Sequence, residues 1–161
     1  MRKWRHLGEA GFSLVELLFV LVIMAILASA ARPLLLNSAK RSQELQLRSA
    51  LKQIRSAIDD YKHATEGGRI AVPATGTGYP PNLKSLVEGV SDLRSPLGKK
   101  IYFLRYIPRD PFADASTPAE ETWRIRPSDA DPGEYRVGVD VFDVASMSEK
   151  IALNGSMYRD W

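Results

Sequence analysis

Apolar residues fill the first fifth of the chain after a short basic start. From Phe12 to Ala31 the run is interrupted by one charged residue, Glu16. A helix over this run would rise ~1.5 Å per residue to about 30 Å, which is enough to cross a bilayer. We therefore predict a membrane helix over residues 12–33. It closes with Pro33, which removes a hydrogen bond and bends the helix axis.

Beyond this run the pattern becomes amphipathic, and we predict that residues 34–66 continue the same helix. The apolar positions recur at spacings of three and four and form one stripe: Leu47, Ala50, Leu51, Ile54, Ala57, Ile58 and Tyr61. Charged residues mostly occupy the other faces: Lys40, Arg41, Glu44, Arg48, Lys52, Arg55 and Asp59. Gly67 and Gly68 should end the helix. Because a helix gains most of its stability from packing, the stripe needs a globular partner.

Residues 67–161 are expected to be that partner, a small globular domain. Asn82 is suited to cap a short helix over residues 83–88. The strand-like segments are residues 101–107, residues 123–126, part of residues 137–146, and a short piece of residues 152–161 around an Asn-Gly turn. The predicted fold class is α+β, in which a small antiparallel sheet lies against the helical stripe.

Composition limits the chain to one anchored domain. Its 161 residues carry a net charge of +3 and no cysteine, so no disulfide can close a loop. The basic leader, residues 1–11, should stay in the cytoplasm, because Lys and Arg flank the cytoplasmic end of a membrane helix. Residues 34–161 would then lie outside the inner membrane.

Residue types that catalyse reactions or bind metals are sparse. The two histidines are not expected to form a metal site, because His6 belongs to the leader and His63 lies near the end of the predicted helix. The sequence has no cysteine cluster, glycine-rich phosphate loop or Gly-x-Ser-x-Gly elbow. We expect neither an enzyme nor a nucleic-acid-binding protein.

The junction between the leader and the apolar run is the most specific motif. A secretory signal peptide places its small-residue cleavage site after the apolar stretch, whereas Gly11 precedes it here. The segment Gly11-Phe12-Ser13-Leu14-Val15-Glu16 resembles the class III signal of type IV pilins and type II secretion pseudopilins. The resemblance implies cleavage between Gly11 and Phe12 by a prepilin peptidase, and N-methylation of Phe12. It also implies that Glu16 pairs with the N-terminal amine of a neighbouring subunit during assembly, and that Pro33 marks where the helix can loosen.

A second resemblance lies in the globular part. Tyr79-Pro80-Pro81 before the short helix, and Ile107-Pro108-Arg109-Asp110-Pro111-Phe112 after it, resemble the G-type (major) pseudopilin pattern. Phe112 stands where that family usually has tryptophan. This order of motifs favours a secretion pseudopilin over a pilin.

G-type pseudopilins also bind calcium in a loop near their C-terminus, and residues 142–146 resemble the strand before that loop. The resemblance leaves Asp143, Ser146 and Asn154 as candidate ligands. Calcium needs about six to eight oxygen ligands, and Lys150, where an aspartate is expected, would oppose the ion. The alternative is a loop in which Asn154 and Asp143 make local turn hydrogen bonds.

The sequence thus favours a structural subunit of a type II secretion pseudopilus, with no cofactor required. Its expected partners are other pseudopilin subunits, prepilin peptidase, the inner-membrane assembly platform and the lipid bilayer. Two alternatives remain open. One is a minor type IV or competence pilin that serves adhesion, DNA uptake or twitching, and the other is a tip subunit that binds secreted cargo. The sequence leaves major and minor subunits undistinguished.

Overall fold

The computed structural model describes residues 13–74 and 76–161, with the backbone alone over residues 30–36. The chain divides into two compact units, residues 1–39 and residues 40–161. The helix α1 (Leu14–Glu66) contributes to both units, and its backbone continues through Pro33. Among the described residues, none of the helices is both long and apolar enough to cross a membrane. The membrane role of residues 12–33 stays a prediction.

Helix α1 ends where the two glycines predict. The N–H of Gly67 donates to the carbonyl of His63 at 2.8 Å, and that of Arg69 donates to the carbonyl of Ala64 at 2.9 Å. Gly68 has a φ of 64°, a left-handed conformation that glycine adopts without steric cost. These bonds satisfy carbonyls that would otherwise be left open at the end of the helix.

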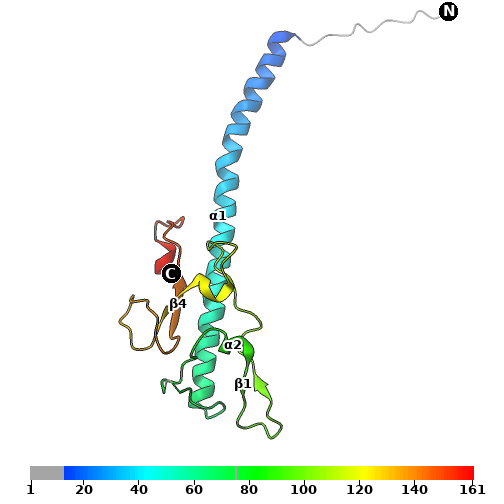
Figure 1. Cartoon of the computed structure of the whole chain (residues 1–161). Helices are drawn as coiled ribbons and strands as arrows, with labels where there is room; N and C mark the ends of the chain where they lie inside the picture. The colour runs from blue at the N-terminus through cyan, green and yellow to red at the C-terminus, as the bar shows by residue number, and fades with distance from the viewer. Residues whose placement is uncertain (1–12, 75) are drawn as a thin grey trace, which may run out of the picture. The chain divides into compact units, whose positions relative to one another are not determined.

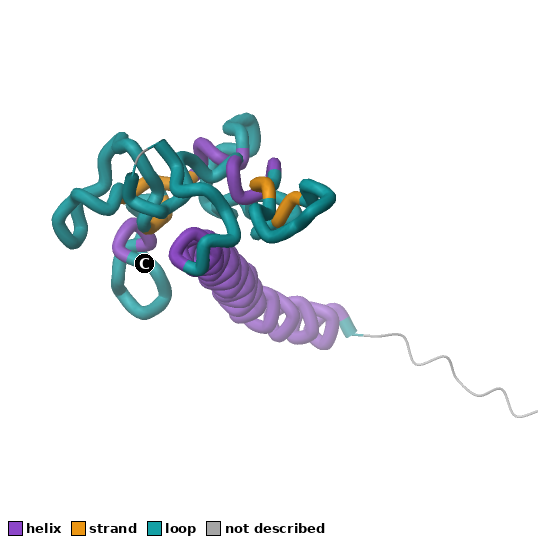
Figure 2. Tube along the Cα trace, turned by 90° about the horizontal axis from the view of Figure 1, so that it is seen from below, coloured by secondary structure: helices purple, strands orange, loops and turns teal. Residues whose placement is uncertain are grey.

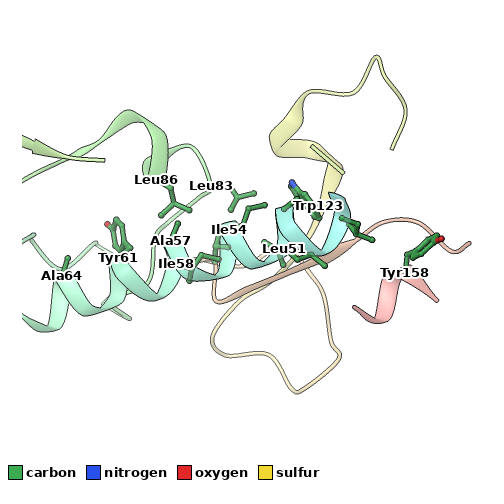
Figure 3. Close-up of a cluster of buried hydrophobic side chains, with 14 of the residues drawn as sticks. Leu51, Ile54, Ala57, Ile58, Tyr61, Ala64, Leu83, Leu86, Trp123 and Tyr158 are labelled. Carbon is green, nitrogen blue, oxygen red and sulfur yellow. The ribbon is translucent and has the colours of Figure 1, made fainter. Parts of the chain in front are cut away.

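The predicted apolar stripe is the core of the second unit. Every stripe residue from Leu47 to Tyr61 is at most 5% exposed. In Figure 3 the stripe side chains face Leu83 and Leu86, Trp123 and Tyr158 of the globular part. Figure 2, viewed nearly along α1, shows the strands and loops gathered over one side of this half of the helix. The expected partner of the stripe is therefore the rest of the chain.

The short helix begins two residues later than predicted, so Lys84 rather than Asn82 stands at its N-cap position, although Asn82 still bonds to the first turn. The helix α2 (Ser85–Glu88) begins after Asn82, whose Oδ1 accepts the N–H of Ser85 at 2.9 Å. Gly89 ends it with a φ of 78°, and a side chain there would collide with the ring of Tyr102. Leu86 is fully buried against α1, so this single turn covers the stripe.

The α+β class is confirmed, but the strands form two small sheets rather than one (Figure 1). The strands β1 (Val90–Ser91) and β2 (Lys100–Ile101) pair antiparallel, as do β3 (Trp123–Arg126) and β4 (Asp143–Ser146). The remaining helical pieces are two 3-10 turns, η1 (Ala119–Thr122) and η2 (Tyr158–Asp160). The β3–β4 register places Trp123 opposite Ser146.

Two strand predictions are wrong in extent. The strand expected over residues 101–107 stops at Ile101, because the N–H groups of Phe103 and Leu104 donate instead to the carbonyl of Leu86, at 3.0 and 2.9 Å. The strands expected over residues 123–126 and within residues 137–146 are present as β3 and β4. The last segment makes one isolated bridge, Ile151 with Met157, and then turns into η2 in place of a third strand.

Candidate functional site

The described part of the apolar run presents its side chains to the surroundings. From Leu14 to Leu27 the large apolar side chains are between 48% and 81% exposed. A helix that is apolar on all sides is stable only where other apolar groups cover it. This surface therefore needs a partner of its own kind, either lipid tails or other apolar helices.

Glu16 lies in the first turn of α1, inside this apolar surface. A carboxylate near a helix N-terminus interacts favourably with the helix dipole, by ~0.3–1 kcal/mol when exposed. That gain is small beside the cost of taking an unpaired carboxylate out of water. Once the run is covered, Glu16 needs a cation or hydrogen-bond donors. The predicted processing residues, Gly11 and Phe12, lie outside the described residues, and Pro33 is described by its backbone alone.

In the second unit, Asp143 already has two cationic partners. Its Oδ1 lies 2.7 Å from Nε of Arg55 on α1, and its Oδ2 lies 3.2 Å from Nη2 of Arg126 on β3. Oδ1 also accepts the N–H of Val144 at 2.8 Å. Both oxygens of this first predicted calcium ligand are thus engaged by protein donors.

Ser146, the second candidate ligand, lies at the other end of β4 and is fully buried. Its hydroxyl donates to Oδ2 of Asp110, while Oδ1 of Asp110 accepts the N–H of Phe112 at 2.8 Å. The N–H of Asp110 in turn donates to Oγ1 of Thr122 at 3.2 Å. Asp110 is 2% exposed, so the Asp-Pro turn is tied to the end of β4 by a buried carboxylate. The sequence identified this turn but not its contact with Ser146.

Asn154, the third candidate, makes the local turn bonds of the alternative interpretation. Its Oδ1 accepts the N–H of Ser156 at 3.1 Å and the hydroxyl of Ser156 at 2.7 Å. In the described parts of the chain, residues 13–74 and 76–161, no three His, Asp or Glu side chains cluster as metal ligands do. Two guanidinium groups at Asp143 would repel a divalent cation. The candidate ligands therefore do not fit a calcium site.

The residues that sequence reasoning missed are charged side chains of α1. Lys40 Nζ donates to the carbonyl of Ile151 at 2.7 Å. Glu44 Oε1 accepts the N–H of Leu153 at 2.7 Å. The guanidinium of Arg48 lies 4.3 Å from the centre of the Trp161 ring. We call Lys40, Glu44, Arg48 and Arg55 the charged row of α1.

The charged row follows from helical periodicity. Its members are four, four and seven residues apart, so their side chains project from one side of the helix, beside the apolar stripe. The spacing from Lys40 to Glu44 and Arg48 could have indicated this row in the sequence. The same spacing is equally typical of a solvent-exposed helix face. The row instead holds the last segment, residues 150–161.

Tyr158 is the buried end of that segment. Its hydroxyl donates to Oε1 of Glu44 at 2.9 Å, and its side chain is fully buried. Burial, and after it the hydrogen bond to Glu44 and the charge of that carboxylate, together raise the pKa of Tyr158 to about 12. The ring stacks on Phe112 with centroids 4.0 Å apart, so Tyr158 joins α1 to the Asp-Pro turn.

Comparison with known proteins agrees with the two resemblances. Residues 7–31 match the family model described as the prokaryotic N-terminal methylation motif. The chain is also similar to the Type II secretion system core protein G of Klebsiella michiganensis, with 27% identity over 112 residues. That match covers 67% of this chain and 71% of the relative. No solved structure gives a significant match. The chain is thus type IV pilin-like at its N-terminal end and distantly similar to a type II secretion core protein.

Proposed function

We propose that the chain is a structural, non-enzymatic subunit of a type II secretion pseudopilus. A prepilin peptidase would cut between Gly11 and Phe12 and methylate the new N-terminus. The processed subunit would then polymerise into a periplasmic filament that promotes protein export. The observation that carries this proposal is Glu16 in the first turn of an exposed apolar helix within the methylation motif.

Two kinds of apolar surroundings would cover residues 13–29 in turn. Before assembly, lipid tails would cover the apolar side chains, and the precursor would rest in the inner membrane with its basic leader in the cytoplasm. In the filament, the same faces of neighbouring helices would cover one another. Glu16 would then meet the methylated amine of Phe12 on the adjacent subunit, since a buried carboxylate without a partner is costly.

The assembly role of Glu16 is tested by substitution in cells that process and assemble the chain. Glu16→Gln keeps the shape of the side chain and removes its charge, so cleavage and membrane insertion should continue while filament yield falls. Leu18→Ala, in the same exposed surface, is the control that keeps the charge. Filaments of Glu16→Gln at normal yield would refute the pairing.

The processing site is tested separately. Gly11→Ser should leave an uncleaved precursor of larger apparent mass on a gel, and mass spectrometry of the wild type should find methylated Phe12 at the N-terminus. A Gly11→Ser chain that migrates like the mature protein would place the cut elsewhere.

The secretion branch, rather than a pilus branch, is supported by the similarity to core protein G. Deleting the gene should reduce the release of exported proteins and leave twitching motility and DNA uptake unchanged. The reverse result would favour a minor type IV or competence pilin.

A further inference from the structure

We propose that Arg55 is an internal cation that closes the last segment, residues 150–161, onto the domain, and that this closure needs no calcium. The proposal concerns the domain rather than its assembly, so it goes beyond the proposed function and does not depend on it.

The guanidinium of Arg55 joins three oxygens from two places in the chain, the start of β4 and Trp161. Its Nε lies 2.7 Å from Oδ1 of Asp143, while Nη2 donates to the carbonyl of Val144 at 2.9 Å. The same Nη2 donates to the main-chain oxygen of Trp161 at 3.0 Å. One positive group therefore connects α1, β4 and the last residue of the sequence. A planar guanidinium with fixed donors is suited to this arrangement, whereas a lysine offers a single point charge.

Around Asp143, two guanidinium groups face one carboxylate, so the local net charge is already positive. Arg126 binds the other oxygen of Asp143, and its guanidinium also lies 4.7 Å from the centre of the Phe142 ring. The side chains of Asp143 and Arg126 are each 18% exposed, so solvent screens them only partly. A calcium ion placed at Asp143 would have to displace one guanidinium and approach another.

The other members of the charged row contact residues 150–161 at further positions. Lys40 binds the carbonyl of Ile151, and Glu44 accepts from Leu153 and Tyr158. Trp161 packs under Arg48 and donates its indole N–H to the hydroxyl of Ser156 at 2.7 Å. Apart from the bond between Trp161 and Ser156, each of these contacts comes from a side chain of α1, so α1 holds the segment at several points.

Local opening of the domain would be detected in the last segment, residues 150–161. Arg55 links the segment to β4 and holds the main-chain oxygen of Trp161, while Glu44 and Arg48 contact the side chains of Tyr158 and Trp161. Loss of Arg55 should therefore free residues 157–161 locally and leave the stripe packed. Local opening of this kind is measured by amide hydrogen exchange.

The experiment compares the full chain in detergent with and without calcium, by hydrogen exchange and thermal melting. In the wild type, millimolar calcium and a chelator should give the same exchange in residues 150–161 and the same melting temperature. Arg55→Gln should raise exchange in residues 157–161 by about tenfold or more, because charge-assisted hydrogen bonds are lost. Arg55→Lys should recover part of the protection.

Lys52→Gln is the matched control. Lys52 is exposed on the same helix as Arg55. Both side chains line a groove of about 510 Å³ beside Trp161. Its substitution removes one positive charge near the segment, so exchange should stay at the wild-type rate. Calcium-dependent protection of the wild type, or equal exchange in Arg55→Gln and Lys52→Gln, would overturn the proposal. The calcium comparison on the wild type stands even where Arg55→Gln fails to fold.

Discussion

The hydroxyl of Tyr158 donates to the carboxylate of Glu44 across a distance of 2.9 Å, although the two residues lie 114 positions apart. Glu44 is 9% exposed and Tyr158 is fully buried, so this bond is made out of contact with bulk water. Glu44 also accepts the N–H of Leu153. One carboxylate on α1 therefore fixes both the turn before η2 and η2 itself.

Removing the phenolic hydroxyl should weaken the domain. Tyr158→Phe keeps the ring that stacks on Phe112 but deprives the buried Glu44 of one donor. We expect the free energy of unfolding to fall by ~1–3 kcal/mol, the cost of a buried polar group left without its partner. Urea denaturation of the full chain in detergent measures it. A change below ~0.5 kcal/mol would mean that water replaces the hydroxyl.

The same bond predicts a loss of stability at high pH. The pKa of Tyr158 is raised from 10.0 to about 12 in the folded chain, so the neutral phenol is the form that folding favours. Its contribution is complete below pH 10 and is lost as the pH rises toward 12. Burial also raises the pKa of Tyr61 and Tyr135, so Tyr158→Phe should reduce this loss without abolishing it. Melting temperatures across this pH range test the prediction; equal slopes for wild type and variant would contradict it.

Asp110 should contribute more than a turn residue ordinarily does. Asp110→Ala would leave the buried hydroxyl of Ser146 and the N–H of Phe112 without their acceptor. We expect a loss of ~1–3 kcal/mol in the free energy of unfolding. Asp114→Ala is the control, because Asp114 is exposed and its carboxylate accepts from the N–H and the hydroxyl of Ser116 within its own turn. Equal losses in both variants would show that Asp110 acts locally.

The apolar stripe carries the packing of the second unit. Ile54→Ala, at a fully buried position, should cost ~2–5 kcal/mol, because it removes buried methyl groups and leaves a cavity. Leu45→Ala, on the same helix with its side chain 61% exposed, should stay within about 0.5 kcal/mol of the wild type. Denaturation of both variants checks the difference, and similar losses would place the core elsewhere.

Periodicity explains why the helix was predictable in full and the strands only in part, with β3 and β4 found where they were expected. The stripe from Leu47 to Tyr61 repeats at a helical spacing over several turns, and local capping by Gly67 and Asn82 needs no distant partner. Strand pairing depends on which backbone groups happen to meet. Residues 102–107 have strand-like composition, yet two of their N–H groups bond to the carbonyl of Leu86 instead.

The candidate sites also divide into those that a local sequence pattern predicts and those that depend on distant contacts. The sequence by itself determined the methylation motif, the apolar run with Glu16, and the stripe that needs a covering domain, because each is a short-range pattern. Only the tertiary structure decided the fate of Asp143. Its oxygens face Arg55 on α1 and Arg126 on the paired strand β3, and the sequence pattern indicated neither contact. Whether a charged side chain binds a ligand, forms an ion pair or faces solvent depends on the groups that folding brings within a few ångströms of it. The spacing of residues along the chain does not carry that information.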